Sequence, residues 1–168
     1  MRQMHTSESK DLIHFKQAIR SGSAGPHVHA LLLGLDTFDL QRLLRSVERG
    51  FPYQSFEHLT RNLTLPQERL AEILGIPRRT LTRRKSEGRF APDESDRLLR
   101  LSRLFGRALE LFEGDRESAT GWLSTKQPAL GGATPFDLAK TELGAREVEN
   151  LIGRNLPVVS FSLYLLNL

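Results

Sequence analysis

The amino-acid sequence predicts an all-α protein: a small helical N-terminal domain with a helix-turn-helix, linked by a longer helix to a small helical C-terminal domain. Apolar residues recur at spacings of three and four, as on one face of a helix. The alternation typical of strands is nearly absent before the last dozen residues. Glycine follows several of the predicted helices, where helices commonly end.

The composition is that of an ordinary globular protein. Of the 168 residues, 39% are hydrophobic, which is enough to bury a core. The absence of cysteine excludes disulfides, thiolate metal sites and cysteine nucleophiles. The first residues lack the apolar core of a secretory signal, and no run approaches the roughly 20 apolar residues of a membrane span. We therefore expect no membrane partner.

Four segments are expected along the chain. Residues 1–28 are polar and rich in Ser and Gly, so we expect a mobile segment with at most a weak helix from Asp11 to Arg20. Residues 29–107 form the helix-turn-helix domain and residues 108–154 the C-terminal domain. Residues 155–168 form an apolar tail of open role: a strand added to a partner, a segment folded onto the core, or an altered terminus.

The N-terminal domain begins with an amphipathic helix predicted from Asp39 to Arg49, with Thr37 as its N-cap and Gly50 just beyond its end. A short helix from Gln54 to Arg61 follows. The apolar face of the first helix comprises Leu40, Leu43, Leu44 and Val47. The apolar face from Leu31 to Val47 is suited to dimerisation of the N-terminal helices, and whether they dimerise stays open from the sequence.

Two short helices around Gly75 form the predicted helix-turn-helix. Thr64, with Gln67 three residues later, is expected to form a capping box at the start of the first helix. The second helix is expected to begin near Ile76 and to end near Gly88. The residues expected to pack the two helices inward are Leu70, Ala71, Ile73, Leu74 and Leu81.

Positive charge is concentrated around this motif. Residues 61–107 contain 12 Lys/Arg and 6 Asp/Glu, a net charge of +6, whereas residues 1–60 carry +1 and residues 108–168 carry −3. A helix-turn-helix places its second helix in the DNA major groove, where arginine can bind guanine edges or phosphates. The alternative is a solvated basic helix without a partner. We predict DNA contacts from Arg78, Arg79, Thr80, Thr82, Arg83, Arg84, Lys85 and Arg89.

Within this set, Arg78, Arg79 and Arg83 are expected to face the groove. The other three cations are expected to lie nearer the phosphate backbone; they are Arg84, Lys85 and Arg89.

The second half of the chain reads as a series of helices. A long helix is predicted to start at Pro92 and to end before Gly114, because proline and acidic residues suit a first turn. A short helix carries Trp122, which we expect in the core. Thr134 is expected to cap a helix that ends near Gly144. A last helix is predicted from Ala145 to Arg154, with Val148, Leu151 and Ile152 inward.

The two halves together resemble the MbcA/ParS/Xre antitoxin family. Residues 68–104 look like its Xre-type helix-turn-helix region, and residues 121–154 resemble its C-terminal toxin-binding domain. The resemblance covers about residues 33–154. Its landmarks in the second half are Trp122-Leu123, Leu130-Gly131-Gly132, Thr134-Pro135, Gly144-Ala145 and Val148-Glu149.

This resemblance implies a cytoplasmic antitoxin of a type II toxin–antitoxin system. Such a protein neutralises its cognate toxin by blocking the toxin's active site, and it represses its own operon by binding operator DNA. The commonest partner is a RES-domain toxin that consumes NAD, and family members tend to form homodimers. Toxin contacts are expected on the outward side of the last helix, which is otherwise a solvated face; they are Arg146, Glu147, Glu149, Asn150 and Arg154.

The family usually closes with a short polar ending, whereas here an apolar stretch follows Arg154. This departure puts in doubt any toxin contact that the family makes with its extreme C-terminus.

Two other functions remain open from the residues alone. The chain could be an ordinary transcriptional regulator whose C-terminal domain dimerises or senses a ligand. A helical enzyme is the other possibility, but the five histidines adjoin no recognisable nucleophile and there is no glycine-rich phosphate loop. His27 and His29 form an HxH pair without a third ligand nearby. We therefore expect no enzymatic activity, no cofactor and no metal.

Overall fold

The computed structural model describes residues 8–22, 24–37 and 39–155, and this part of the chain folds into helices without a β-strand. The predicted all-α class is confirmed. The apolar tail from residue 156 onward lies outside the described residues. The elements are α1 Lys10–Arg20, the 3-10 helix η1 Val28–Leu33, α2 Leu40–Arg49, α3 Tyr53–Leu63, α4 Gln67–Ile73, α5 Arg78–Glu87, α6 Pro92–Leu111, α7 Arg116–Ser124, the 3-10 helix η2 Pro128–Leu130, α8 Pro135–Leu138 and α9 Glu142–Asn155.

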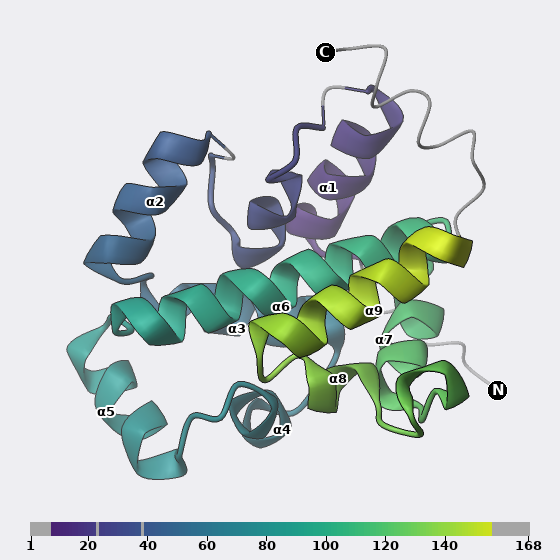
Figure 1. Ribbon diagram of the computed structural model, residues 1–168. Coiled ribbons are helices and arrows are strands. Elements are labelled where there is room, and N and C mark those ends of the chain that lie inside the picture. Colours follow the sequence, from purple (N-terminus) through teal and green to yellow (C-terminus); the bar gives the residue numbers. More distant parts are fainter. Residues whose placement is uncertain (1–7, 23, 38, 156–168) are drawn as a thin grey trace, which may run out of the picture.

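Helix α6 is the central element of the fold. It packs against η1, α7 and α9 and also contacts α2 and α3. In Figure 1 it crosses the molecule, with α1 and α2 on one side, α4 and α5 on the other, and α9 alongside. Its predicted apolar stripe is buried; it includes Leu98, Leu101, Leu104, Phe105 and Ala108. The predicted domain boundary at 107/108 therefore falls inside one continuous helix whose residues belong to a single core.

Part of the N-terminal segment that we expected to be mobile is a packed helix. The weak helix predicted there is α1, and its Leu12 and Phe15 are buried in the core. Asp11 also holds α1 to α3: its carboxylate lies 2.6 Å from His58 Nδ1 and accepts a hydrogen bond from Asn62 Nδ2 at 3.2 Å. Polar residues surround Phe15 in the sequence, so the pattern did not indicate that α1 packs against the core.

Two predicted helix caps are wrong. The N-cap of α2 is Asp39, whose side chain accepts a hydrogen bond from Arg42 N at 3.0 Å, and Thr37 accepts instead from Asp39 N. Thr64 does not cap α4, because it closes α3 in the left-handed conformation (φ 55°), and Pro66 takes the N-cap position. Because Thr64 closes α3, it does not form the predicted capping box at the start of α4.

The C-terminal helices divide differently from the prediction. The helix capped by Thr134 is short, because α8 ends at Leu138, and α9 runs through Gly144. A Cβ at Gly144 would overlap the carbonyl oxygen of Leu138, so this glycine permits the close approach of α8 to α9. The Thr141 hydroxyl accepts a hydrogen bond from Gly144 N at 3.0 Å and supports the first turn.

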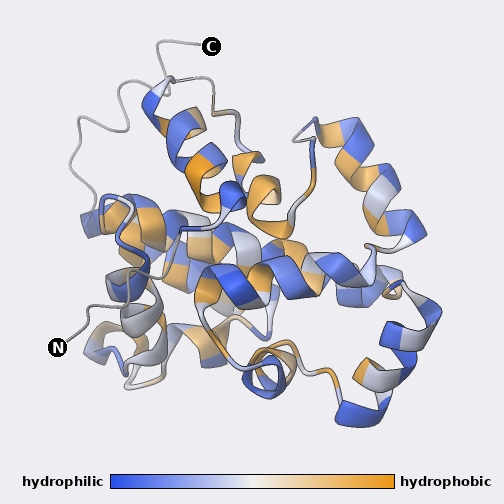
Figure 2. Ribbon diagram, turned by 180° about the vertical axis from the view of Figure 1, so that it is seen from behind, coloured by the Kyte–Doolittle hydropathy of each residue, from blue (hydrophilic) through white to orange (hydrophobic). Residues whose placement is uncertain are grey.

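The surface of the fold is uneven in polarity. Figure 2 shows apolar residues gathered where the helices meet, whereas the ribbon of α5 is largely hydrophilic. No residue of α5 is buried. Across the described ranges, none of the helices combines the length and apolar character that a membrane crossing requires.

Candidate functional site

The helix-turn-helix consists of α4, a turn at Gly75 and α5. Helix α4 is anchored to the core by Leu70, Ala71 and Ile73, which are all buried. Gly75 has φ 64°, in the left-handed region that favours glycine, and Ile76 N then donates to Ala71 O at 2.8 Å. The tight turn directs α5 out of the body, as the predicted motif requires.

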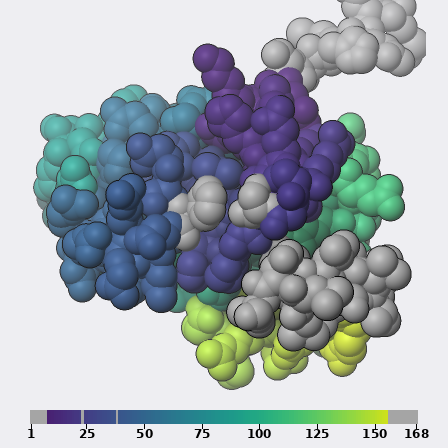
Figure 3. All heavy atoms as spheres, turned by 90° about the horizontal axis from the view of Figure 1, so that it is seen from above, coloured from purple at the N-terminus to yellow at the C-terminus, as the bar shows by residue number. Residues whose placement is uncertain are grey.

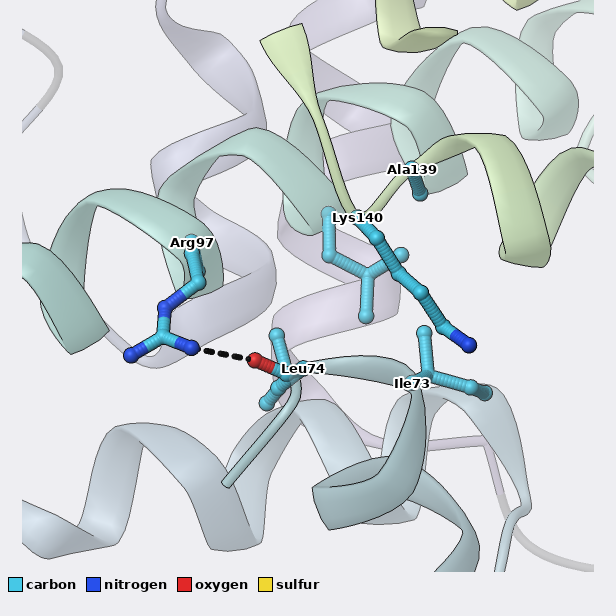
Figure 4. A pocket seen from close by; sticks show the side chains of 6 residues that line it. Ile73, Leu74, Arg97, Ala139 and Lys140 are labelled. Carbon is cyan, nitrogen blue, oxygen red and sulfur yellow. Dashed lines mark hydrogen bonds between the residues drawn. The ribbon is translucent and has the colours of Figure 1, made fainter.

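Arg97 of α6 holds this turn in place, and the sequence did not reveal it. Its Nη1 donates to the carbonyl of Leu74 at 2.9 Å and to that of Gly75 at 3.2 Å. Figure 4 shows the guanidinium reaching Leu74 beside a small recess that Ile73 and Lys140 also line. The recess has no room for a ligand. Since 22 residues separate Arg97 from Gly75, no local sequence pattern could have indicated this contact.

Helix α5 presents most of the predicted DNA-contacting residues to solvent. The exposed ones among them are Arg78, Arg79, Thr82, Arg83 and Lys85, while Thr80 is half-buried. In the described part of the chain, no ion pair ties Arg78, Arg79 or Lys85 to a carboxylate, and Arg83 Nε lies 3.8 Å from Glu87. Within the described residues, Arg78, Arg79 and Lys85 are therefore exposed cations without a carboxylate partner.

Arg84 differs from its neighbours because two carboxylates of the protein bind its guanidinium group. Its Nε and Nη2 donate to the two carboxylate oxygens of Glu94 at 2.7 and 3.1 Å, and its Nη1 donates to Glu87 at 2.7 Å. The Arg84 side chain is 17% exposed and that of Glu94 is 7% exposed. These hydrogen bonds, above all those with Glu94, raise the pKa of Arg84. Arg84 is thus paired within the protein and links α5 to α6, and its predicted phosphate contact stays a prediction.

Arg89 follows α5 and lies beside the segment that joins α2 to α3. Its Nη1 donates to the carbonyl of Gly50, beside an isolated β-bridge between Pro52 and Arg89. Phe90 N donates to Phe51 O at 2.9 Å and joins the same two segments. The Arg89 residue remains exposed, so its predicted phosphate contact is compatible with this position.

Helix α9 is fixed to α6 by a group of ion pairs. Arg100 Nε lies 2.9 Å and Arg103 Nη2 lies 3.1 Å from the Glu142 carboxylate. Partial burial opposes ionisation of Glu142, but Arg103 and Arg100 outweigh it and lower its pKa. Arg103 Nε also donates to Glu149. These contacts hold one side of α9 against α6.

The side of α9 away from these ion pairs carries Glu147, Asn150 and Arg154, three of the residues predicted to contact a toxin, whereas Arg146 lies beside the ion pairs, with its Nε 3.8 Å from the Glu142 carboxylate. Arg146, Glu147, Asn150 and Arg154 are exposed. Glu149 is the exception, since its bond to Arg103 places its carboxylate on the side that faces α6. The inward set predicted for this helix is largely confirmed: Val148 and Ile152 are buried and Leu151 is half-buried.

Trp122 and His29 both lie in or against the core. Trp122 is partly buried against the core, with its ring centroid 6.4 Å from that of Phe112. His29 is buried, and burial lowers its pKa to about 3, so it is neutral. In the described ranges, no group of three or more potential metal-ligating side chains is found.

Protein-family models match both halves of the chain. The model described as the antitoxin Xre-like helix-turn-helix domain matches residues 42–103. The model described as the antitoxin Xre/MbcA/ParS C-terminal toxin-binding domain matches residues 107–155. The first match contains α4 and α5, and the second contains α7 to α9.

Three curated proteins named antitoxin Xre are similar to this chain. The protein from Yersinia enterocolitica is 40% identical over 113 residues, which cover 67% of this chain and 76% of the relative. That from Photorhabdus laumondii is 34% identical over 133 residues, covering 79% and 80%. That from Pseudomonas putida is 35% identical over 78 residues, covering 46% and 48%.

Proposed function

This chain belongs to the Xre antitoxin family, and we propose that it holds a cognate toxin inactive through the outward face of α9 and binds operator DNA through α5. The observation that carries the proposal is the order of two matched domains, each with a surface suited to its role. On α5, Arg78, Arg79 and Lys85 have no carboxylate partner among the described residues, and on α9 a mixed polar face belongs to a helix that ion pairs join to α6.

The DNA half of the proposal rests on charge and geometry. Arg78 and Arg79 lie in the first turn of α5, next to the turn of the helix-turn-helix, and their guanidinium groups have no carboxylate partner among the described residues. Arginines so placed can bind base edges and phosphates in a major groove. We propose that this contact represses the protein's own operon.

The toxin half of the proposal concerns the class of toxin that this chain binds. We propose a RES-domain, NAD-consuming toxin, the partner that the family resemblance favours, and inhibition by covering the toxin's active site. The supporting observation is that α9 exposes Arg146, Glu147, Asn150 and Arg154 and that ion pairs join this helix to α6. A fixed helix face binds with little loss of conformational entropy. We propose no enzymatic activity for this chain itself.

We propose that the protein acts as a homodimer through α2. Leu40 and Leu44 are each 48% exposed on this helix, so its predicted apolar face is only partly covered by the core. In the view of Figure 3, α2 forms an outer edge of the face that it shares with α1. Self-association through this helix would bury the two leucines and would present two α5 helices to a two-fold operator.

The test is co-expression with the protein encoded by the adjacent reading frame. If that neighbour arrests growth alone, and this chain restores growth and co-purifies with it, the antitoxin function is supported. DNA binding is measured separately, on the upstream promoter fragment and on a scrambled fragment. An ordinary transcriptional regulator would bind the promoter without restoring growth or co-purifying, and this result would overturn the antitoxin proposal.

A further inference from the structure

One large apolar residue is conspicuously exposed in the C-terminal half. Leu143 is 74% exposed, the highest value among the large hydrophobic residues that remain exposed in the described part of the chain. The others lie on α1 and α2 and are exposed by 38–48%. Within the described residues of the domain matched at 107–155, no second large hydrophobic side chain is exposed. A single exposed leucine is ordinary on a protein surface, and what distinguishes Leu143 is its position within the matched toxin-binding domain.

Leu143 lies on the same helix face as the predicted toxin contacts. It is followed by Glu147, Asn150 and Arg154 at spacings of four, three and four, which align them along one side of α9. All of them are exposed. The face therefore has an apolar residue in its first turn and polar or charged residues along the rest.

The structure holds Leu143 outward. Its neighbours in sequence are both held by contacts: Glu142 pairs with Arg100 and Arg103 at the surface, and Gly144 lies against the backbone of Leu138. These contacts attach the first turn of α9 to the fold with Leu143 on its exposed side.

We infer that Leu143 is the apolar anchor of the toxin contact, entering an apolar recess of the toxin while Glu147, Asn150 and Arg154 contact its polar rim. The inference rests on the proposed function, since the occupant is the toxin that the matched toxin-binding domain implies. Interfaces concentrate their affinity in a few buried side chains surrounded by a polar rim, and this face has that arrangement.

The test uses the full chain and the purified protein from the adjacent reading frame. Three variants are compared with the parent protein by calorimetry or biolayer interferometry: Leu143→Asp, Leu143→Met and, as the matched control, Ile13→Asp. Ile13 is exposed on α1, outside the matched toxin-binding domain. We expect Leu143→Asp to weaken toxin binding at least about 30-fold, the loss typical of an interface hot spot. The Leu143→Met and Ile13→Asp variants should remain within about 3-fold of the parent.

The outcomes separate this inference from the proposed function. If the parent protein itself does not bind the neighbour, the antitoxin function fails; if the parent binds and Leu143→Asp binds equally, only the anchor role is overturned. Promoter DNA binding serves as the folding control, and Leu143→Ala replaces Leu143→Asp if the latter loses DNA binding. Undiminished toxin binding by Leu143→Ala would then overturn the anchor role. Leu143→Asp could instead change self-association and leave toxin affinity unchanged. That result would show that a second copy of the chain covers this face, and it would also overturn the anchor role.

Discussion

Arg84 and Glu94 form a two-point ion pair that joins the end of α5 to the start of α6. The Arg84 Nε and Nη2 atoms donate to the two carboxylate oxygens at 2.7 and 3.1 Å. Glu94 also accepts a hydrogen bond from Ala91 N at 2.8 Å, which caps α6. The Glu94 carboxylate thus links the exposed basic helix α5 to the central helix α6. Since Glu94 is nearly buried, loss of Arg84 would leave a charge without its partner.

Replacing Arg84 by alanine should therefore destabilise the protein. We expect the free energy of unfolding, measured by urea denaturation, to fall by roughly 3 kcal/mol, because breaking a buried ion pair strands the remaining charge. Lys85→Ala, in the next exposed position, should change it by less than about 0.5 kcal/mol. Equal stability of the two variants, with DNA binding lost in both, would instead place Arg84 in the DNA contact.

The exposed cations of α5 should determine DNA affinity. Combined replacement of Arg78, Arg79 and Arg83 by alanine should weaken promoter binding and flatten its salt dependence, by about 0.9 in the logarithmic slope for each lost phosphate contact. Fluorescence anisotropy at several salt concentrations measures both effects. The matched control removes Arg146 and Arg154 from α9 instead; it should leave the DNA slope unchanged and reduce toxin binding. The same loss in both variants would show that only net charge matters.

Two glycines of α9 should respond oppositely to alanine. At Gly144 the added methyl group would overlap the Leu138 carbonyl oxygen, so we expect a loss of about 1–3 kcal/mol in unfolding free energy. At Gly153 a Cβ would meet nothing within 4 Å, and alanine should stabilise the helix by up to about 1 kcal/mol. Thermal and urea denaturation of the two variants compares these directions. A stable Gly144→Ala protein would mean that α8 and α9 are free to separate.

Stability should decline below neutral pH because of His29. Burial lowers the pKa of His29 to about 3, whereas an unfolded chain has the ordinary value of 6.5. Between these values the unfolded chain binds a proton that the folded protein excludes, so stability is lost as pH falls below about 6.5 and is fully present above it. From pH 7.5 to 5.5 we expect about 1 kcal/mol more loss in the parent protein than in His29→Leu. Parallel urea titrations at both pH values test this, and an identical loss in the two proteins would rule out His29 as the cause.

The exposed leucines of α2 should govern self-association. Replacing Leu40 and Leu44 together by glutamine should shift the mass measured by light scattering from dimer toward monomer, since the variant removes apolar area from the proposed interface. Ile13→Gln, a polar replacement on α1, is the control and should leave the mass unchanged. A parent protein that is already monomeric at micromolar concentration would overturn the dimer proposal.

The sequence predicted those features that depend on local pattern. The apolar stripe of α6, the turn at Gly75 and the start of α8 at Thr134 follow from spacing and cap chemistry, and they are present. The exposure of Arg78 and Arg79 on α5 also follows from the helical pattern.

Other features depend on which element of the fold uses a residue, and the local sequence pattern does not show this. Thr64 looked like a cap but closes the preceding helix. Gly144 looked like a helix end but meets the backbone of another element. Arg84 looked like its basic neighbours, and only the three-dimensional arrangement shows the partner ten residues away that neutralises it. Leu143 was not singled out, because a lone leucine carries no signal until its burial is known.

Helix α6 has a consequence for how this protein can be divided. The two matched family domains meet between residues 103 and 107, in the middle of an unbroken helix whose first half carries Glu94 and Arg97 and whose second half packs with α7. Cutting the chain there would remove core residues from both parts. The two surfaces that we propose for DNA and toxin therefore rest on one shared helix, and neither matched domain would keep its whole core if it were exchanged for another without α6.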